Sequence, residues 1–401
     1  MEINKYMIMK HRILLAVLFI AVSLAASAQG ICTINGTITD NRLSDGKKVK
    51  KVYLTRTNEL GQEIEVAQAK VRKGKYTLTY PFAQDEHVLL YAIKGFGEGK
   101  DIGLFVEPGT VSVTTASAMR PELSTATGTP TNDAYTAYKA ILRDGADEAE
   151  KKIAALAEQH DEQWLNSPEG KSTAKRIVAQ ETIKTESEAL RFLIDHNASP
   201  MTPLEMECTL LPKLSEAYAG QVLNAVSTTL HAHPYYQSLR NSVLASSMKV
   251  GNEVPDITLH LLDGDTKHLV DYRGRYVILN FWKNNCEKSA EMLAELNNLY
   301  EVIKPHQDQY IIISVSLDSD VAAWKSIVNG AGTNREGWLH ACDGMGTDSP
   351  AAKLYKVVAT PKTILIEPEG LAVSLDMETD EMVMRIEQIL SGDLYYLDQK
   401  E

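Results

Sequence analysis

Apolar and polar positions alternate with a period of two through residues 30–116. Segments such as 32–38 and 76–80 follow this pattern, and turns with glycine, such as Lys73-Gly74, separate them. Alternation of this kind is typical of half-buried strands, and many short strands at even spacing indicate a sandwich or a barrel. The pattern predicts a small all-β sandwich domain at residues 29–116.

The pattern then changes to the period of a helix. Residues 117–130 are rich in Ser, Thr, Pro and Gly, which is typical of a linker. Beyond Thr131, whose hydroxyl can cap a helix, Tyr138, Ile141 and Leu142 recur at helical spacing. We find no repeat of fixed period, so residues 117–246 are predicted to be a linker and a helical connector.

The pattern changes once more near residue 247. Residues 276–282 and 310–317 are short apolar runs that suit buried strands, and a helix with an apolar face separates them. Two further strands, 363–366 and 371–374, and a last helix, 382–390, complete the chain. Strands that alternate with helices indicate a mixed α/β fold for residues 247–401.

The first 28 residues have the order of a secretory signal peptide. Basic residues precede an apolar run at 13–24, and small residues at 26–28 offer a cleavage site before Gln29. The run is shorter than the roughly 20 residues that span a membrane. We therefore expect export to the periplasm or cell envelope and no stable membrane span after cleavage, with an uncleaved anchor as the alternative. Ile31 before Cys32 argues against a lipoprotein signal.

Charge and cysteine content narrow the classes of function. The formal net charge is −12. An acidic chain without a basic cluster repels phosphate backbones, so nucleic acid is not an expected partner. The four cysteines, Cys32, Cys208, Cys286 and Cys342, contain no C-x-x-C pair, so spacing predicts neither a zinc knuckle nor a dithiol motif.

His231 and His233 are the one local histidine pair that would suit a metal. No third ligand stands at a recognisable spacing, so a surface turn is the better interpretation. Nucleotide-binding and hydrolase motifs are missing from the sequence, and we expect no cofactor and no metal.

Cys286 lies where a predicted buried strand passes into a helix. Backbone N–H groups and the helix dipole stabilise an anion there, which lowers the pKa of a thiol. Lys283 and Lys288 would add to this effect, while Glu287 and Glu291 oppose it.

Phe281-Trp282, with Cys286 four residues after the tryptophan and then an amphipathic helix, resembles the active-site turn of the thioredoxin superfamily. Further segments, in the same order along the chain, narrow the resemblance to the TlpA/ResA-like envelope branch, which is related to AhpC/TSA proteins. These segments are residues 250–256, 263–264, 272–277, 351–357, 360–363 and 366–370. The N-terminal segment resembles a small β-domain of unknown function that often precedes such domains, through residues 36–38, 74–77 and 105–109. The resemblance implies a thioredoxin-like fold, a cis Pro361 beside Cys286, and a Thr360 backbone that receives an extended substrate.

The sequence departs from that family at the second cysteine. Ser289 replaces it and has no sulfur with which to resolve a mixed disulfide. Lys288 replaces the common proline, and Asn280 stands where thioredoxin has a buried acid. Cys342 is the remaining candidate for a distant resolving thiol. Peroxidase activity is disfavoured, because Leu279 and Lys283 occupy the positions of the peroxiredoxin proline and hydroxyl residue.

Two hypotheses follow. The first is a monothiol thiol–disulfide oxidoreductase or isomerase that uses Cys286, acts on protein or small-molecule thiols and disulfides, and needs an external thiol donor, with Trp282, Ser289, Thr360 and Pro361 as neighbours of the active site. The alternative is a non-catalytic binding protein that holds a partner in the groove beside Pro361.

Overall fold

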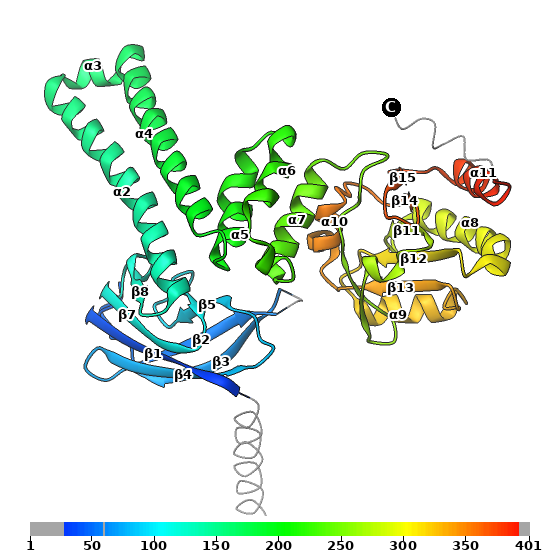
Figure 1. Ribbon diagram of the computed structural model, residues 1–401, viewed down its shortest axis with the longest axis horizontal. Helices are drawn as coiled ribbons and strands as arrows, with labels where there is room; N and C mark the ends of the chain where they lie inside the picture. Colours follow the sequence, from blue (N-terminus) through cyan, green and yellow to red (C-terminus); the bar gives the residue numbers. More distant parts are fainter. Residues whose placement is uncertain (1–27, 59–60, 393–401) are drawn as a thin grey trace, which may run out of the picture. The chain divides into compact units, whose positions relative to one another are not determined.

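The computed structural model describes residues 28–58 and 61–392 (Figure 1). They divide into two compact units. One holds the described residues up to Leu210 together with Ala225–Tyr236, and the other holds Leu211–Asn224 and the described residues from Gln237 onward. The predicted signal peptide, apart from its last position, lies outside the described residues. Within the described ranges no helix combines the length and the apolar character needed to cross a bilayer.

The N-terminal β-domain consists of two four-stranded sheets, in the orders β4-β1-β7-β8 and β3-β2-β5-β6. Strands β1 and β7 are parallel, and the other neighbours are antiparallel. Alternate side chains from both sheets, such as Ile34 and Leu54, are buried in one apolar core. The prediction of a β-domain is therefore confirmed. The strands are β1 (Ala28–Asp40), β2 (Lys51–Thr57), β3 (Glu63–Lys70), β4 (Lys75–Ala83), β5 (Leu89–Lys94), β6 (Ile102–Val106), β7 (Gly109–Ser117) and β8 (Thr125–Thr127).

Much of the segment expected to be a linker belongs to this β-domain. Strand β8 pairs with β7, Ala126 is buried, and the hydroxyl groups of Thr115 and Ser124 are hydrogen-bonded at 2.8 Å. The polar composition misled the prediction because these hydroxyl groups find partners inside the domain.

The helical region begins with two long helices, α2 (Pro130–Gln159) and α4 (Pro168–Asp195), joined through the short α3 (Glu162–Asn166). They approach closely at Gly145, where a Cβ would lie 1.9 Å from the Thr185 hydroxyl. The region continues through α5 (Met201–Glu205), a π-helical turn at Met206–Leu210, α6 (Glu216–Ala225) and α7 (Pro234–Ser246).

The histidine pair lies at the start of α7. His233 is buried, contrary to the expected surface turn. Its Nε2 is hydrogen-bonded to the carbonyl of Val88 at 3.1 Å, and its Nδ1 accepts from the N–H of Tyr235 at 3.2 Å. Both ring nitrogens thus have backbone partners, and His231 stacks on Tyr236 instead.

The C-terminal unit has a five-stranded sheet of order β13-β12-β11-β14-β15, in which β11, β12 and β13 are parallel to one another, β14 is antiparallel to β11, and β15 is antiparallel to β14. A short hairpin, β9 (Thr258–His260) and β10 (Thr266–His268), precedes it and has its turn at Asp263 and Gly264. The elements match the predicted mixed α/β order: β11 (Tyr276–Trp282), α8 (Glu287–Ile303), β12 (Tyr310–Ser316), α9 (Val321–Gly330), β13 (Trp338–Cys342), α10 (Pro350–Leu354), β14 (Lys362–Ile366), β15 (Ala372–Ser374) and α11 (Thr379–Leu390).

Strand β11 lies at the centre of this sheet and is buried on both faces. Ile278 packs with residues of α8 and α11, such as Leu296 and Ile386, while Leu279 and Phe281 belong to the opposite core. A strand buried on both sides reads as a continuous apolar run, which is what the sequence shows. The carboxyl end of β11 therefore has a fixed position.

Candidate active site around Cys286

Cys286 is the N-cap residue of α8, four residues after the end of β11. Its side chain is half-buried, and its thiol donates to the carbonyl oxygen of Thr360 at 3.2 Å. The Thr360–Pro361 peptide bond is cis, and Pro361 comes directly before β14, the antiparallel neighbour of β11. The sheet thus brings the cysteine together with a loop more than 70 residues further along the chain.

Ser289 lies in the first turn of α8 and is fully buried. Its hydroxyl accepts a hydrogen bond from the N–H of Lys283 at 3.3 Å, which leaves the hydroxyl proton free to donate. The pKa of Cys286 is lowered mainly by the hydrogen bond from this hydroxyl and next by backbone N–H groups of the helix start. The serine in the position of the second cysteine therefore stabilises the thiolate.

The effect of the nearby lysines on the Cys286 thiol differs from the one predicted from the sequence. Lys283 and Lys288 both have exposed side chains. Lys288 lowers the pKa of the Cys286 thiol through its backbone N–H rather than through its ammonium group. Hydrogen-bond donors fixed at the start of α8 thus favour the thiolate.

The sequence did not lead us to predict a role for Asp318 at this site. It follows the carboxyl end of β12, is buried, and accepts the backbone N–H of Asn284 at 3.2 Å on each carboxylate oxygen. The hydroxyl of Ser316 donates to the same carboxylate at 2.7 Å. Asp318 therefore holds the loop that carries Cys286. A signal was present, since an acid directly after a buried parallel strand lies at the edge where sites form.

Asn280 is an interior residue of β11. Its side-chain oxygen accepts from the hydroxyl of Thr363 at 3.1 Å, so it links the central strand to β14. It contributes no carboxylate to the site, in agreement with the sequence analysis.

Trp282 and Cys342 belong to a separate apolar cluster with Trp324 and Val328. Cys342 is buried, its thiol donates to the carbonyl of Asp318 at 3.4 Å, and burial raises its pKa. Both Cys342 and Cys286 are free thiols. The structure thus brings Cys286, Ser289 and Thr360 into contact, and it places Cys342 in different surroundings.

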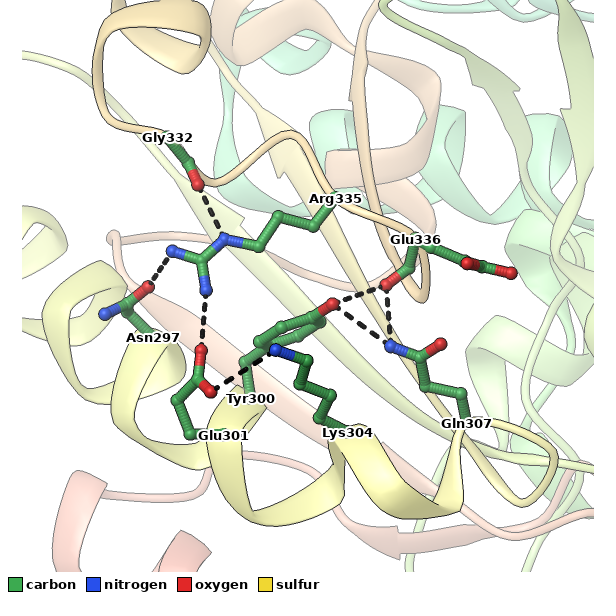
Figure 2. Close-up of polar contacts among 8 residues, drawn as sticks. All are labelled: Asn297, Tyr300, Glu301, Lys304, Gln307, Gly332, Arg335 and Glu336. Carbon is green, nitrogen blue, oxygen red and sulfur yellow. Dashed lines mark hydrogen bonds and ion pairs between the residues drawn. The ribbon is translucent and has the colours of Figure 1, made fainter.

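The far end of α8 is fixed to the loop before β13 (Figure 2). The guanidinium of Arg335 lies 4.9 Å from the ring centre of Tyr300, and it donates to Glu301 at 2.9 Å and to Asn297 at 2.6 Å. The hydroxyl of Tyr300 donates to the carbonyl of Glu336 at 2.9 Å. These contacts hold the helix whose first turn stabilises the thiolate.

Comparison with known proteins agrees with this geometry. Residues 250–373 match the AhpC/TSA family. The thiol-disulfide oxidoreductase ResA of Bacillus anthracis is 32% identical over 126 residues, which are 31% of this chain and 68% of that protein. This chain belongs to the ResA-like, AhpC/TSA-related thioredoxin family. ResA of Bacillus subtilis is 28% identical over 140 residues, 34% of this chain and 74% of that protein.

The other comparisons concern the remaining domain and the solved structures. Residues 32–135 match a domain of unknown function, DUF4369. A thiol-disulfide oxidoreductase from Bacteroides fragilis is 26% identical and covers 34% of this chain and 99% of its own, with a TM-score of 0.32. The thioredoxin domain of a thiol-disulfide oxidoreductase from Bacteroides vulgatus is 25% identical and covers 35% of this chain and 98% of its own, with a TM-score of 0.33.

Proposed function

We propose that this ResA-like chain is an extracytoplasmic protein that exchanges thiols and disulfides through Cys286 as its single reacting thiol. The observation that carries the proposal is the half-exposed Cys286 sulfur at the start of α8, hydrogen-bonded to the carbonyl beside the cis Pro361, with a pKa that the buried Ser289 hydroxyl and the backbone of the first helical turn lower. The thiolate is the nucleophile in disulfide exchange, so a group that favours it prepares the chain for this reaction.

In the first step, the Cys286 thiolate attacks one sulfur of a substrate disulfide. A mixed disulfide forms, and the other substrate sulfur leaves as a thiolate. In the second step, an external thiolate attacks the substrate sulfur of the mixed disulfide and releases Cys286 as a thiolate. The protein is unchanged after one cycle, and the substrate sulfur now carries a new partner.

The surroundings of Cys342 favour an external thiol, rather than Cys342 itself, as the group that resolves the mixed disulfide in the second step. Its sulfur is buried, its pKa is raised by that burial, and its thiol is hydrogen-bonded to the Asp318 carbonyl. A thiol that ionises poorly attacks a mixed disulfide slowly, so a soluble thiol is the better resolving group.

Thr360 and Pro361 form the proposed contact for the substrate. When Cys286 ionises, its sulfur no longer donates to the Thr360 carbonyl, which is then free to accept an N–H from an extended segment. Val358, two residues earlier, has a 99% exposed side chain and extends the same loop with an apolar contact.

Export is the proposed location. It is supported by the order of basic, apolar and small residues in the first 28 positions, which is typical of a secretory signal. An oxidising compartment also supplies the disulfides on which the reaction acts.

The test is exchange of a fluorescent mixed disulfide by the purified chain in the presence of glutathione. Cys208 is exposed, so all proteins carry Cys208→Ser to remove its reactivity. We expect the Cys286→Ser variant to react at the background rate and a Cys342→Ser variant to keep most of the activity.

Loss of activity in Cys342→Ser, with a folded protein, would contradict the monothiol cycle. Equal rates with and without Cys286 would contradict exchange altogether and favour the binding protein. In that case a partner captured in pull-downs should depend on Thr360 and not on the Cys286 sulfur.

A further inference from the structure

A cavity of about 540 Å³ lies in the β-domain, at the end of β1. Three segments line it: residues 38–42, residues 48–50, and the turn with Val71, Lys73 and Gly74. Its volume falls in the range of small-molecule sites, roughly 300–1,000 Å³. It belongs to the domain for which neither the proposed function nor the family match gives a role.

Positive charge dominates this cavity. Arg42, Lys48, Lys50 and Lys73 line it, against a single acid, Asp40. The chain as a whole has a formal net charge of −12, so this local excess of positive charge is opposite in sign to the charge of the whole chain. The expectation that the chain has no basic cluster is wrong here: Lys47, Lys48, Lys50 and Lys51 already form a basic run in the sequence, and the fold adds Lys73 from a separate segment.

The other acid of this segment, Asp45, lies outside the cavity lining and is already paired. Asp45 binds the ammonium group of Lys47 at 2.8 Å and accepts the backbone N–H of the same residue at 2.9 Å. Among the described residues, the four cavity cations take part in none of the ion pairs. Asp40 offsets one of the four positive charges, and solvent ions or a bound anion would relieve the remaining repulsion.

The backbone around the cavity is fixed. The N–H of Ile38 donates to the carbonyl of Gly74 at 2.6 Å, and a Cβ on Gly74 would lie 2.4 Å from the Ile38 carbonyl. The neighbouring Lys73 has a φ of 50°, a conformation that needs a supporting structure in a residue other than glycine. On the other side, the Asn41 amide donates to the Val49 carbonyl at 3.1 Å. The cations are thus presented by a preformed frame.

We propose that this cavity binds a ligand with more than one negative charge, carried on phosphate groups. Lysine ammonium groups bind phosphate as point charges. A phosphate monoester carries nearly two negative charges at neutral pH, whereas a carboxylate carries one. Several cations around a cavity larger than one phosphate therefore suit a ligand with two or more phosphates, or a phosphate joined to an organic group. The source is either a soluble polyphosphate compound or a lipid headgroup.

Calorimetric titration of the full chain with inorganic tripolyphosphate tests the proposal, and sedimentation with vesicles that contain cardiolipin, whose headgroup carries two phosphates, distinguishes the two sources. The test variant is Lys48→Gln/Lys50→Gln/Lys73→Gln. The control is Lys171→Gln/Lys175→Gln/Lys184→Gln, which removes three exposed cations from α4 and changes the net charge equally.

We expect saturable binding that weakens with added salt, falls at least tenfold in the cavity variant and changes little in the control. If the cavity variant loses tripolyphosphate binding, the cavity is assigned to a soluble ligand. If it loses vesicle binding alone, the cavity is assigned to a lipid headgroup. Binding of neither probe by the unaltered chain, or equal losses in the two triple variants, would overturn the proposal.

Discussion

The structure gives Ser289 a role that the sequence alone does not indicate. In the sequence it marks a lost resolving thiol, because oxygen cannot take part in disulfide exchange. In the structure its hydroxyl is buried between the N–H of Lys283 and the sulfur of Cys286. One substitution thus removes the second redox group and keeps a hydrogen bond that favours the remaining thiolate.

Ser289→Ala should raise the pKa of Cys286 and slow its alkylation at pH 7, because the main donor to the thiolate is lost. The measurement is the rate of iodoacetamide labelling in the Cys208→Ser background. Ser326→Ala, at an exposed position of α9, is the control and should leave the rate unchanged. An unchanged rate in Ser289→Ala would show that the serine does not act on the sulfur.

The sequence predicted part of this site because Cys286, Thr360 and Pro361 stand in segments with recognisable local patterns. For Asp318 the sequence offers only its position after a buried strand, which does not identify its partner. Its role depends on the pairing of β12 with β11, which brings it to the N–H of Asn284 across 34 residues of chain. A contact made by a backbone N–H leaves no trace in side-chain spacing.

At the scale of elements, the site depends on how the carboxyl ends of β11 and β12 hold the loop between β11 and α8. Asp318 accepts donors from both the loop and its own strand end. At the other end of α8, Arg335 and Tyr300 fix the helix to the loop before β13 (Figure 2). The cysteine is thus held between two anchored elements.

Asp318→Asn should lower the free energy of unfolding of the C-terminal unit by about 1–3 kcal/mol, because an amide nitrogen then faces a backbone or hydroxyl donor. Denaturant unfolding followed by tryptophan fluorescence measures this, since Trp282, Trp324 and Trp338 are in that unit.

The matched control for this variant is Asp320→Asn. Asp320 caps α9 by accepting the N–H of Ala323, and asparagine caps a helix about as well as aspartate. A loss of stability as large in Asp320→Asn as in Asp318→Asn would contradict a special role for the Asp318 carboxylate.

At the scale of the whole molecule, the order of the domains could be predicted from the sequence, because the period of the apolar pattern changes from two to helical and then to mixed. The extent of the β-domain beyond residue 116 could not, since strand β8 lies in a segment of Ser, Thr and Gly. The lysine run at 47–51 is visible in the sequence, but the cavity is not, because residues 38–50 and 71–74 meet only after the strands pair.

Acid should destabilise the C-terminal unit through His340. Burial lowers the pKa of this histidine to about 4, and its Nε2 is hydrogen-bonded to the Thr333 carbonyl. Between pH 4 and about 6.5 the unfolded chain binds a proton that the folded unit excludes, so stability rises with pH across this window and is lost on acidification.

His340→Gln should therefore reduce the slope of unfolding free energy against pH by up to about 1.4 kcal/mol per unit within that window. His306→Gln is the control, and the same tryptophan signal follows both variants. An unchanged slope in His340→Gln would contradict the burial of a neutral histidine at this position.

The most direct test of the central claim is the pH dependence of Cys286 alkylation in the reduced Cys208→Ser protein, with Cys208→Ser/Cys286→Ser as the blank. An activated thiolate predicts a midpoint below the ordinary thiol value of about 8.5. A midpoint at or above that value, or no labelling of Cys286 in the folded protein, would contradict thiol exchange at this site.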